Sequence, residues 1–346
     1  MNNYKPFVSV VIPVEVVGAD LRQAVKHLLT QTYQNFEIII AVTKDNGERF
    51  PKTEIVVAPE LEGRPAERRD LGAKTAKGEI IAFIDDDVYP ENDWLEKAVD
   101  GFKEETVAAV GGPMVTPLDD SLLEKASGWV WASPLGSGGA GTYRCRPQSK
   151  RTVDDYPTAN LLVRKSDFLA VGGFQTQYWP GEDTKLCLDL TKKLGKKIIY
   201  DPEVLVYHHR RALFIPHLRQ IRGYGLHRGH FARILPETSR RLGYFLPSLF
   251  FLFILIAPLK LLIFRWFGWD LLFQLSMVLS IFISAVYFTA LLLTGGWVVI
   301  QSGDWRLGVL VMPGIFTTHL YYGLMFLRGY FSKTVKRSIH PHFWQK

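Results

Sequence analysis

Residues 80–87 read Ile-Ile-Ala-Phe-Ile-Asp-Asp-Asp, an apolar run that ends in three consecutive carboxylates. A short run without polar residues is typical of a strand buried on both faces of a parallel sheet. We therefore predict a strand over Ile80–Ile84, with Asp85, Asp86 and Asp87 in the loop at its carboxyl end.

Strand-like and helical patterns alternate on both sides of this stretch. Further strands are predicted at Phe7–Ile12, Phe36–Val42, Glu54–Val57, Val107–Gly111 and Lys197–Val206, and helices at Asp20–Thr32, Arg64–Thr75, Asn92–Phe102 and Thr184–Leu194. Such alternation favours right-handed crossovers and a parallel sheet. The fold class is therefore α/β over roughly the first two thirds of the chain.

Ligands of open α/β sheets bind beyond the carboxyl ends of the strands. That rule points to Pro13–Glu15 after the first strand, to Thr43–Asp45 after the second and to Asp85–Asp87 after the fourth. We expect these three loops to meet at one rim and to contact a ligand there, with Pro13, Glu15 and Thr43 on its binding side.

The acidic triple has two interpretations. Carboxylate oxygens at i and i+2 suit Mg²⁺ or Mn²⁺, and uncompensated carboxylates this close together repel one another and need a cation. The alternative is a solvated acidic turn that caps the next helix. The triple alone does not decide between them.

Two further polar sets lie later in the chain. Glu182 and Asp183 begin a helix, where the helix dipole favours ionised carboxylates, and one of them can act as a general base. The alternative is a helix N-cap pair. His208 and His209 follow a strand, and either is a metal ligand or a surface histidine beside a basic patch.

Residues 242–331 carry very few charges and divide into about three candidate membrane spans. The spans are Leu242–Phe264, Leu271–Leu293 and Leu307–Leu327, each close to the ~20 residues that a bilayer requires. The formal charge is +7, and the segment Arg210–Arg241 holds eight arginines and one acid. Its juxtamembrane position favours anionic lipid over nucleic acid as the partner.

These patterns divide the chain into four segments. We expect a catalytic domain at 1–212, a basic interfacial segment at 213–241, about three transmembrane helices at 242–331 and a basic tail at 332–346. Two cysteines and no signal peptide favour a cytosolic first domain on the inner face of the cell membrane. Three spans would place the basic tail outside, against the positive-inside rule, so one span is re-entrant or miscounted.

Taken together, these motifs resemble the family 2 glycosyltransferases, the inverting class with a GT-A fold. The resemblance covers about residues 6–230, and the matching segments in chain order are Val8–Pro13, Leu28–Ile38, Gly63–Gly72, Ala76–Glu79, Asp85–Asp87, Thr158–Asn160, Gly172–Phe174, Gly181–Asp183 and Tyr207–His208. The segment His319–Leu324 is similar to membrane-bound exopolysaccharide transferases of the succinoglycan type.

The resemblance implies roles for individual residues. Asp85 and Asp87, with His208, would hold Mg²⁺ or Mn²⁺. Arg69, Asp85 and Asp86 would contact the diphosphate of a nucleotide-sugar donor, for which a UDP-sugar is favoured. Asp183 would be the catalytic base, with Glu182 beside it. The acceptor would be a polyprenyl-linked or other glycan, and no nucleic acid is implied.

Two stretches depart from the family. The usual Asp-Asp-Gly-Ser-like turn is replaced by Val42–Gly47, and the usual Tyr-Asn after Pro13 by Val14-Glu15, which leaves the donor base open. The full Gln-x-x-Arg-Trp motif of processive synthases is absent from Gln220–Gly225, which favours transfer of one sugar per acceptor. A non-catalytic membrane scaffold that retained the fold is the alternative hypothesis.

Overall fold

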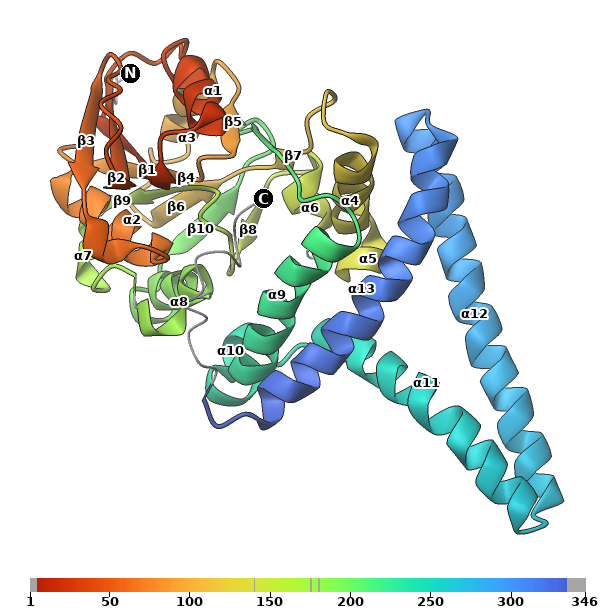
Figure 1. Cartoon of the computed structure of the whole chain (residues 1–346). Helices are drawn as coiled ribbons and strands as arrows, with labels where there is room; N and C mark the ends of the chain where they lie inside the picture. Colours follow the sequence, from red (N-terminus) through yellow and green to blue (C-terminus); the bar gives the residue numbers. More distant parts are fainter. Residues whose placement is uncertain (1–4, 140, 175, 180, 335–346) are drawn as a thin grey trace. The chain divides into compact units, whose positions relative to one another are not determined.

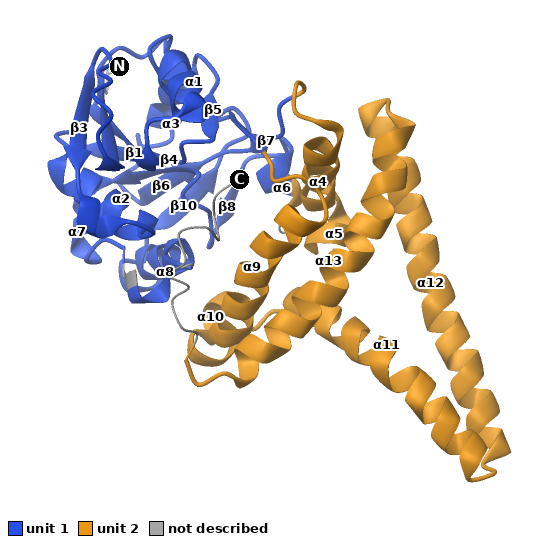
Figure 2. Ribbon diagram, viewed as in Figure 1, with its two compact units in different colours: residues 1–117, 143–209, 336–345 blue, residues 118–142, 210–335, 346 orange. Residues whose placement is uncertain are grey.

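The computed structural model describes residues 5–334 apart from 140, 175 and 180. Its contacts divide the described residues into two compact units (Figure 2). Unit 1 comprises the residues up to Pro117 and Tyr143–His209, and unit 2 comprises Leu118–Thr142 and the residues from Arg210 onward. Most of the predicted basic tail lies outside the described residues.

The two units differ in one segment from the predicted boundaries. Residues 118–142 precede the predicted boundary at 212 but group with the C-terminal helices. Apolar packing explains this, because Ala126 and Val130 are buried in one cluster with Val311 and Ile315. The rest of the predicted division stays a prediction.

The core of unit 1 is an eight-stranded sheet with the order β3-β2-β1-β4-β9-β6-β10-β8. The strands are β1 (Val8–Val16), β2 (Phe36–Lys44), β3 (Thr53–Val57), β4 (Ile80–Ile84), β6 (Val107–Gly111), β8 (Arg151–Val153), β9 (Asn160–Arg164) and β10 (Lys197–Tyr200). The predicted parallel arrangement is confirmed for β3, β2, β1 and β4.

The prediction of a wholly parallel sheet is wrong. Strand β9 pairs antiparallel with both β4 and β6, and β8 pairs antiparallel with β10. Strand β9 follows β8 through a short loop at residues 154–159, so no helical crossover of the kind that makes neighbours parallel leads into it.

Helices cover both faces of this sheet. One apolar cluster joins it to α1 (Ala19–Leu28) and α3 (Trp94–Asp100), and a second joins it to α2 (Pro65–Thr75), α7 (Lys165–Ala170) and α8 (Glu182–Leu188) (Figure 1). Gly72 of α2 lies so close to β1 that a Cβ there would approach Val11 Cγ1 at 2.5 Å. Helix α2 is thereby held against the centre of the sheet.

A small second sheet follows the acidic triple. It consists of β5 (Val88–Pro90), β11 (Val206–His208) and β7 (Met114–Val115), and β11 pairs antiparallel with β5 and parallel with β7. Because β5 begins directly after Asp87, this sheet brings the end of β11 to the acidic triple.

Unit 2 is helical. Its helices are α4 (Leu122–Ala132), α5 (Pro134–Ser137), α9 (Ile215–Ile234), α10 (Pro236–Ser239), α11 (Leu242–Trp266), α12 (Asp270–Ser302) and α13 (Trp305–Phe331). Helices α11, α12 and α13 are long and apolar enough to cross a membrane, at mean hydropathies of 2.4, 2.2 and 1.3 over their most apolar stretches.

Candidate active site

Arg69 of α2 joins carboxylates from distant parts of the sequence. Its Nη2 contacts Asp85 Oδ1 at 2.5 Å, at the end of β4, and its Nη1 contacts Glu182 Oε1 at 3.0 Å, at the start of α8. The Arg69 side chain is only 7% exposed and that of Glu182 only 6%. Burial acts to lower the pKa of Arg69, but the charges of Asp85, Glu182 and Asp183 outweigh it and raise the pKa.

Glu182 and Asp183 have different surroundings. Both oxygens of Glu182 are engaged, Oε1 by Arg69 and Oε2 by the backbone N–H of Gly181 at 2.9 Å. Burial raises the pKa of Glu182, although Arg69 acts to lower it. Asp183 Oδ1 accepts the backbone N–H of Thr184 at 2.7 Å. The structure therefore places Glu182 as a buried partner of Arg69.

Asp86 lies between two further carboxylates of the acidic triple. Burial, and then the neighbouring charges of Asp87 and Asp85, raise its pKa to about 7. Three carboxylates so close together repel one another unless a cation compensates them. A cation bound beside Asp86 would relieve this repulsion.

Asp87 lies beside His208. The pairing of β11 with β5 places His208 opposite Val88, and His208 Nε2 lies 3.4 Å from Asp87 Oδ1. The backbone N–H of His209 donates to Asp87 O at 3.1 Å, while its ring approaches Gln23 Oε1 at 3.2 Å. Of the two histidines, His208 is thus the one whose ring reaches the acidic triple.

Pro13, Glu15 and Thr43 lie within strands, because β1 and β2 run beyond the predicted ends at Ile12 and Val42. Pairing of β1 with β4 ends at Val11, so the missing N–H of Pro13 falls where β1 has a single partner strand. The predicted loops after these strands therefore begin later than expected.

Glu15 is the centre of a second charged cluster. Its Oε1 accepts from Arg68 Nη1 at 2.7 Å and from the backbone N–H of Gly63 at 3.0 Å, and its Oε2 accepts from Thr43 Oγ1 at 2.9 Å. Arg68 is 4% exposed; burial lowers its pKa, and Glu15 opposes this. Sequence reasoning missed Arg68, whose acidic partner Glu15 lies 53 residues earlier in the chain.

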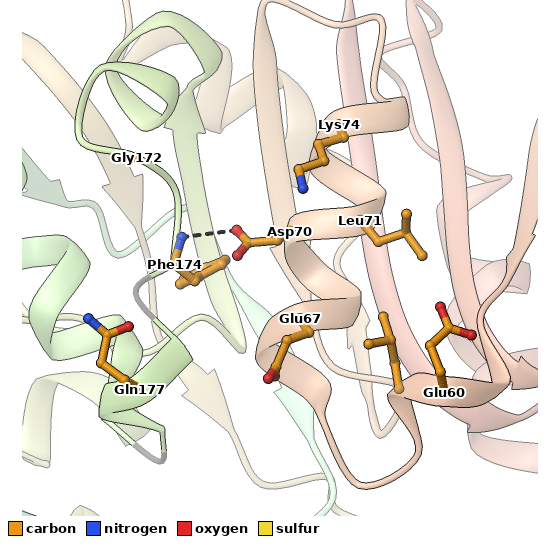
Figure 3. Close-up of a pocket in the computed structure, with 9 residues that line it drawn as sticks. Glu60, Glu67, Asp70, Leu71, Lys74, Gly172, Phe174 and Gln177 are labelled. Carbon is orange, nitrogen blue, oxygen red and sulfur yellow. Dashed lines mark hydrogen bonds between the residues drawn. The ribbon is translucent and has the colours of Figure 1, made fainter.

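A pocket of about 470 Å³ lies along another side of α2. Its lining includes Glu67, Asp70, Lys74, Phe174 and Gln177 (Figure 3). Asp70 Oδ1 accepts the backbone N–H of Phe174 at 2.9 Å, which ties the Gly-Gly-Phe loop to α2. Burial raises the pKa of Asp70 to about 6. No predicted site residue is among the described residues that line this pocket.

Within the described part of the chain, no group of three or more His, Cys, Asp or Glu side chains is arranged as a ready metal site. The predicted ligand set is brought together only in part. Asp87 lies beside His208, whereas the nearest partner of Asp85 is the guanidinium of Arg69. The oxygen and imidazole donors present nevertheless fit a hard divalent cation.

Comparison with known families identifies this arrangement, because residues 9–169 match glycosyl transferase family 2. The chain carries a family 2 glycosyltransferase domain. The match includes Arg69 and the acidic triple and ends before Glu182, so the charged cluster is assembled partly from residues beyond it.

Curated relatives are glycosyltransferases as well. The pre-mycofactocin glycosyltransferase of Mycobacterium tuberculosis is 30% identical over 216 residues, which are 59% of this chain and 43% of that protein. The glucosyl-dolichyl phosphate glucuronosyltransferase of Haloferax volcanii is 25% identical over 206 residues, 54% of this chain and 63% of that protein. The chain thus spans less than two thirds of the length of either relative.

A solved structure has a similar fold and covers nearly the whole of this chain. The mannosyltransferase of Pyrobaculum calidifontis, in complex with GDP-Man and Mn²⁺, superposes with a TM-score of 0.56 at 17% identity. The superposition covers 96% of this chain and 89% of that one. The GT-A class predicted from the sequence is confirmed, followed by three apolar helices.

Proposed function

We propose that this chain transfers one sugar from a nucleotide-diphosphate donor to a hydroxyl of a lipid-linked acceptor, with inversion at the anomeric carbon. One observation carries the proposal: Arg69 contacts both Asp85, at the end of β4, and Glu182, which precedes Asp183 at the start of α8. Transfer requires the groups that bind the donor diphosphate, here at the end of β4, to lie near the base that deprotonates the acceptor, here at the start of α8.

Several findings support the choice of substrates. The Haloferax relative is named for a glucosyl-dolichyl phosphate acceptor, and a Methanococcus voltae relative, 21% identical over 239 residues, for a dolichyl-linked sugar phosphate. The Pyrobaculum structure holds GDP-Man and Mn²⁺. A nucleotide-diphosphate sugar as donor and a membrane lipid carrying a phosphate-linked glycan as acceptor follow as proposals, with the nucleotide base left to experiment.

The proposed chemistry assigns a proton transfer to Asp183. Asp183 takes the proton of the acceptor hydroxyl as that oxygen bonds to the anomeric carbon, and the bond from that carbon to the donor diphosphate breaks with its electron pair. Glu182 is a positioning residue, because both of its oxygens are already bound. It orients Arg69, which also holds Asp85.

Mg²⁺ or Mn²⁺ fits the acidic triple, where Asp85, Asp87 and His208 would hold it. Such an ion, when bound, neutralises negative charge on a leaving diphosphate. Three adjacent carboxylates favour a cation here, and burial together with the charges of Asp87 and Asp85 raises the pKa of Asp86. Asp86, Pro13, Glu15 and Thr43 stay predicted donor contacts.

The decisive experiment combines a donor panel with one isosteric substitution. UDP-, GDP- and dTDP-sugars are offered with Mn²⁺ and, in parallel, with a chelator, to the full chain in membranes containing a polyprenyl-linked acceptor. Asp183→Asn is expected to abolish transfer while the Kd of the donor, measured by calorimetry, changes little. Asp100→Asn, an exposed carboxylate on α3, is the matched control and is expected to transfer normally.

Three outcomes would contradict the proposal. Normal turnover by Asp183→Asn would remove the base assignment. If the unaltered chain neither bound nor turned over any donor, the non-catalytic scaffold would be favoured. An anomeric proton coupling in the product that matches that of the donor would show retention and exclude a single displacement.

A further inference from the structure

The three apolar helices of unit 2 have unequal surroundings. In the most apolar 18-residue stretch of each helix, protein buries 44% of the residues in α13 but only 11% in α11 and 6% in α12. By apolarity and length alone, all three helices qualify as membrane spans. Their different burial distinguishes α13 from α11 and α12.

Helix α9 runs along the C-terminal half of α13 at very short range. A Cβ at Gly229 would lie 2.0 Å from Phe326 O, and one at Gly329 would lie 2.0 Å from Leu226 O. Backbones this close form one tightly packed pair, so α9 and this half of α13 must share one layer. Helix α9 carries Arg219, Arg222, Arg228 and Arg233, side chains that the hydrocarbon core disfavours strongly.

Helix α4 flanks the N-terminal half of α13 and also contacts α9. Ala126 and Val130 of α4 are buried with Val311 and Ile315, and a Cβ at Gly314 would contact Val130 at 3.0 Å. Ser127 Oγ lies 2.8 Å from His217 Nδ1 of α9. A capping box with Glu124 begins α4, and the hydrocarbon core disfavours such a carboxylate strongly.

Polar groups are also found at both ends of α13. Asp304 caps its first turn and pairs with Arg306 at 2.8 Å. At the other end Arg233 of α9 donates to the carbonyl of Ser332. A crossing orientation of α13 would draw α4 and α9 with their charges through the bilayer, whereas an orientation in the plane of the membrane keeps all of them at the headgroups.

The first part of α12 and the last part of α11 have the opposite character. Ile254–Trp266 and Leu271–Val286 expose most of their large apolar side chains, and Figure 1 shows their loop projecting from the other helices of unit 2. Trp266 and Trp269 flank this loop beside an ion pair of Arg265 with Asp270 at 3.3 Å, as expected of a loop at a membrane interface. Helix α12 has 33 residues, about 50 Å, so it crosses a core of about 30 Å and still continues alongside α13.

We propose that α13 lies in the headgroup layer with α4 and α9, and that only the α11–α12 hairpin crosses the bilayer. The exposed stripe of α13, which includes Trp305, Val309, Leu324 and Phe331, then rests on the acyl chains. Two crossings return the chain to its original side. The arginine-rich segment 210–241 and the basic residues that follow α13 in the sequence are then on one face, which satisfies the positive-inside rule that three spans violate.

Cysteine accessibility distinguishes two crossings from three. Both native cysteines are buried, so the unaltered chain serves as the unlabelled control. Phe267→Cys probes the α11–α12 loop, Gln301→Cys the end of α12 and Lys333→Cys the segment after α13. Each variant is treated with a membrane-impermeant maleimide in right-side-out and in inverted vesicles, and then in detergent to show that its thiol reacts.

The proposal expects Gln301→Cys and Lys333→Cys to be labelled from one face and Phe267→Cys from the opposite face. Labelling of Lys333→Cys from the same face as Phe267→Cys would show that α13 crosses and would overturn it. Labelling of all three from one face would show that the hairpin does not cross and would overturn it equally. Neither result depends on sugar transfer, so the proposed function stands or falls separately.

Discussion

Replacing Arg69 by methionine tests the charged cluster most directly. The substitution keeps an unbranched apolar stem but leaves Glu182, 6% exposed, and Asp85, 29% exposed, without their shared cation. Removal of one partner of a buried ion pair costs about 3–5 kcal/mol, because the other charge stays buried. For a domain of this size that corresponds to a fall in Tm on the order of 10 °C.

The pH dependence of this loss identifies its cause. Burial already raises the pKa of Glu182, and loss of Arg69 raises it further. An acid whose pKa is higher in the folded than in the unfolded state loses stability as the pH rises from the unfolded value, about 4.3, through the folded one. The deficit of Arg69→Met relative to the unaltered chain is therefore smallest near pH 5 and largest near pH 8.

Thermal unfolding in detergent at both pH values measures these quantities. Arg22→Met removes an exposed ion pair with Glu48 and is the matched control, with little expected loss. Adding Glu182→Gln to Arg69→Met removes the uncompensated charge and is expected to restore part of the Tm. A deficit equal to that of Arg22→Met, or one independent of pH and additive with Glu182→Gln, would refute the reasoning.

Three further predictions concern single contacts. Asp70→Asn keeps an acceptor for the Gly-Gly-Phe loop but removes a carboxylate whose pKa burial raises to about 6. The variant is therefore expected to have a higher Tm than the unaltered chain at pH 8 but not at pH 4, and a lower Tm at pH 8 would contradict this. Glu15→Gln weakens its charged hydrogen bonds, and faster amide exchange at Gly63 is expected, with unchanged exchange as the contrary result. Gly229→Ala forces a methyl group against the backbone of α13 and is expected to lower the free energy of unfolding in detergent by about 1–3 kcal/mol or more. Gly296→Ala, whose Cβ meets nothing within 4 Å, serves as the control. Equal Tm values for the two variants would show that the α9–α13 contact is not close.

The strands of the sheet were predicted best where burial is uniform. Ile80–Ile84 and Val107–Gly111 begin and end where the apolar pattern places them, because every residue in them is buried. The ends of β1 and β2 were not: Pro13 falls where β1 has a single partner strand, and the polar Thr43 of β2 donates to Glu15. A sequence pattern predicts the end of a strand at a polar residue, but the strand continues where the fold provides that residue with a hydrogen-bond partner.

The directions of later strands were beyond sequence reasoning. The single strand predicted over Lys197–Val206 is β10 and β11, which belong to different sheets. The antiparallel insertion of β9 likewise depends on a neighbour chosen in three dimensions. Periodicity reports which faces of an element are buried and gives no information about which element buries them.

In the candidate site, too, the residue types could be predicted from the sequence but their partners could not. The acidic triple, Glu182 and Asp183 were predicted from their position after a strand and at a helix start, but their connection was not. A donor-phosphate contact of Arg69 stays a prediction, and its two carboxylate partners were not foreseen. Its partners lie 16 and 113 residues away in the chain, and no local pattern reports such a separation.

This choice of an arginine has a mechanical consequence for the proposed transfer. A single displacement requires the anomeric carbon, fixed through the donor diphosphate, and the base, fixed through α8, to keep one geometry. Arg69 binds Asp85 and Glu182 with two separate nitrogens of one rigid planar group, so the end of β4 and the start of α8 are fixed to each other rather than each to solvent. The compact ammonium of a lysine cannot span two carboxylates in this fixed fork. In the proposed transfer, a change at either carboxylate is therefore transmitted to the other through the Arg69 side chain.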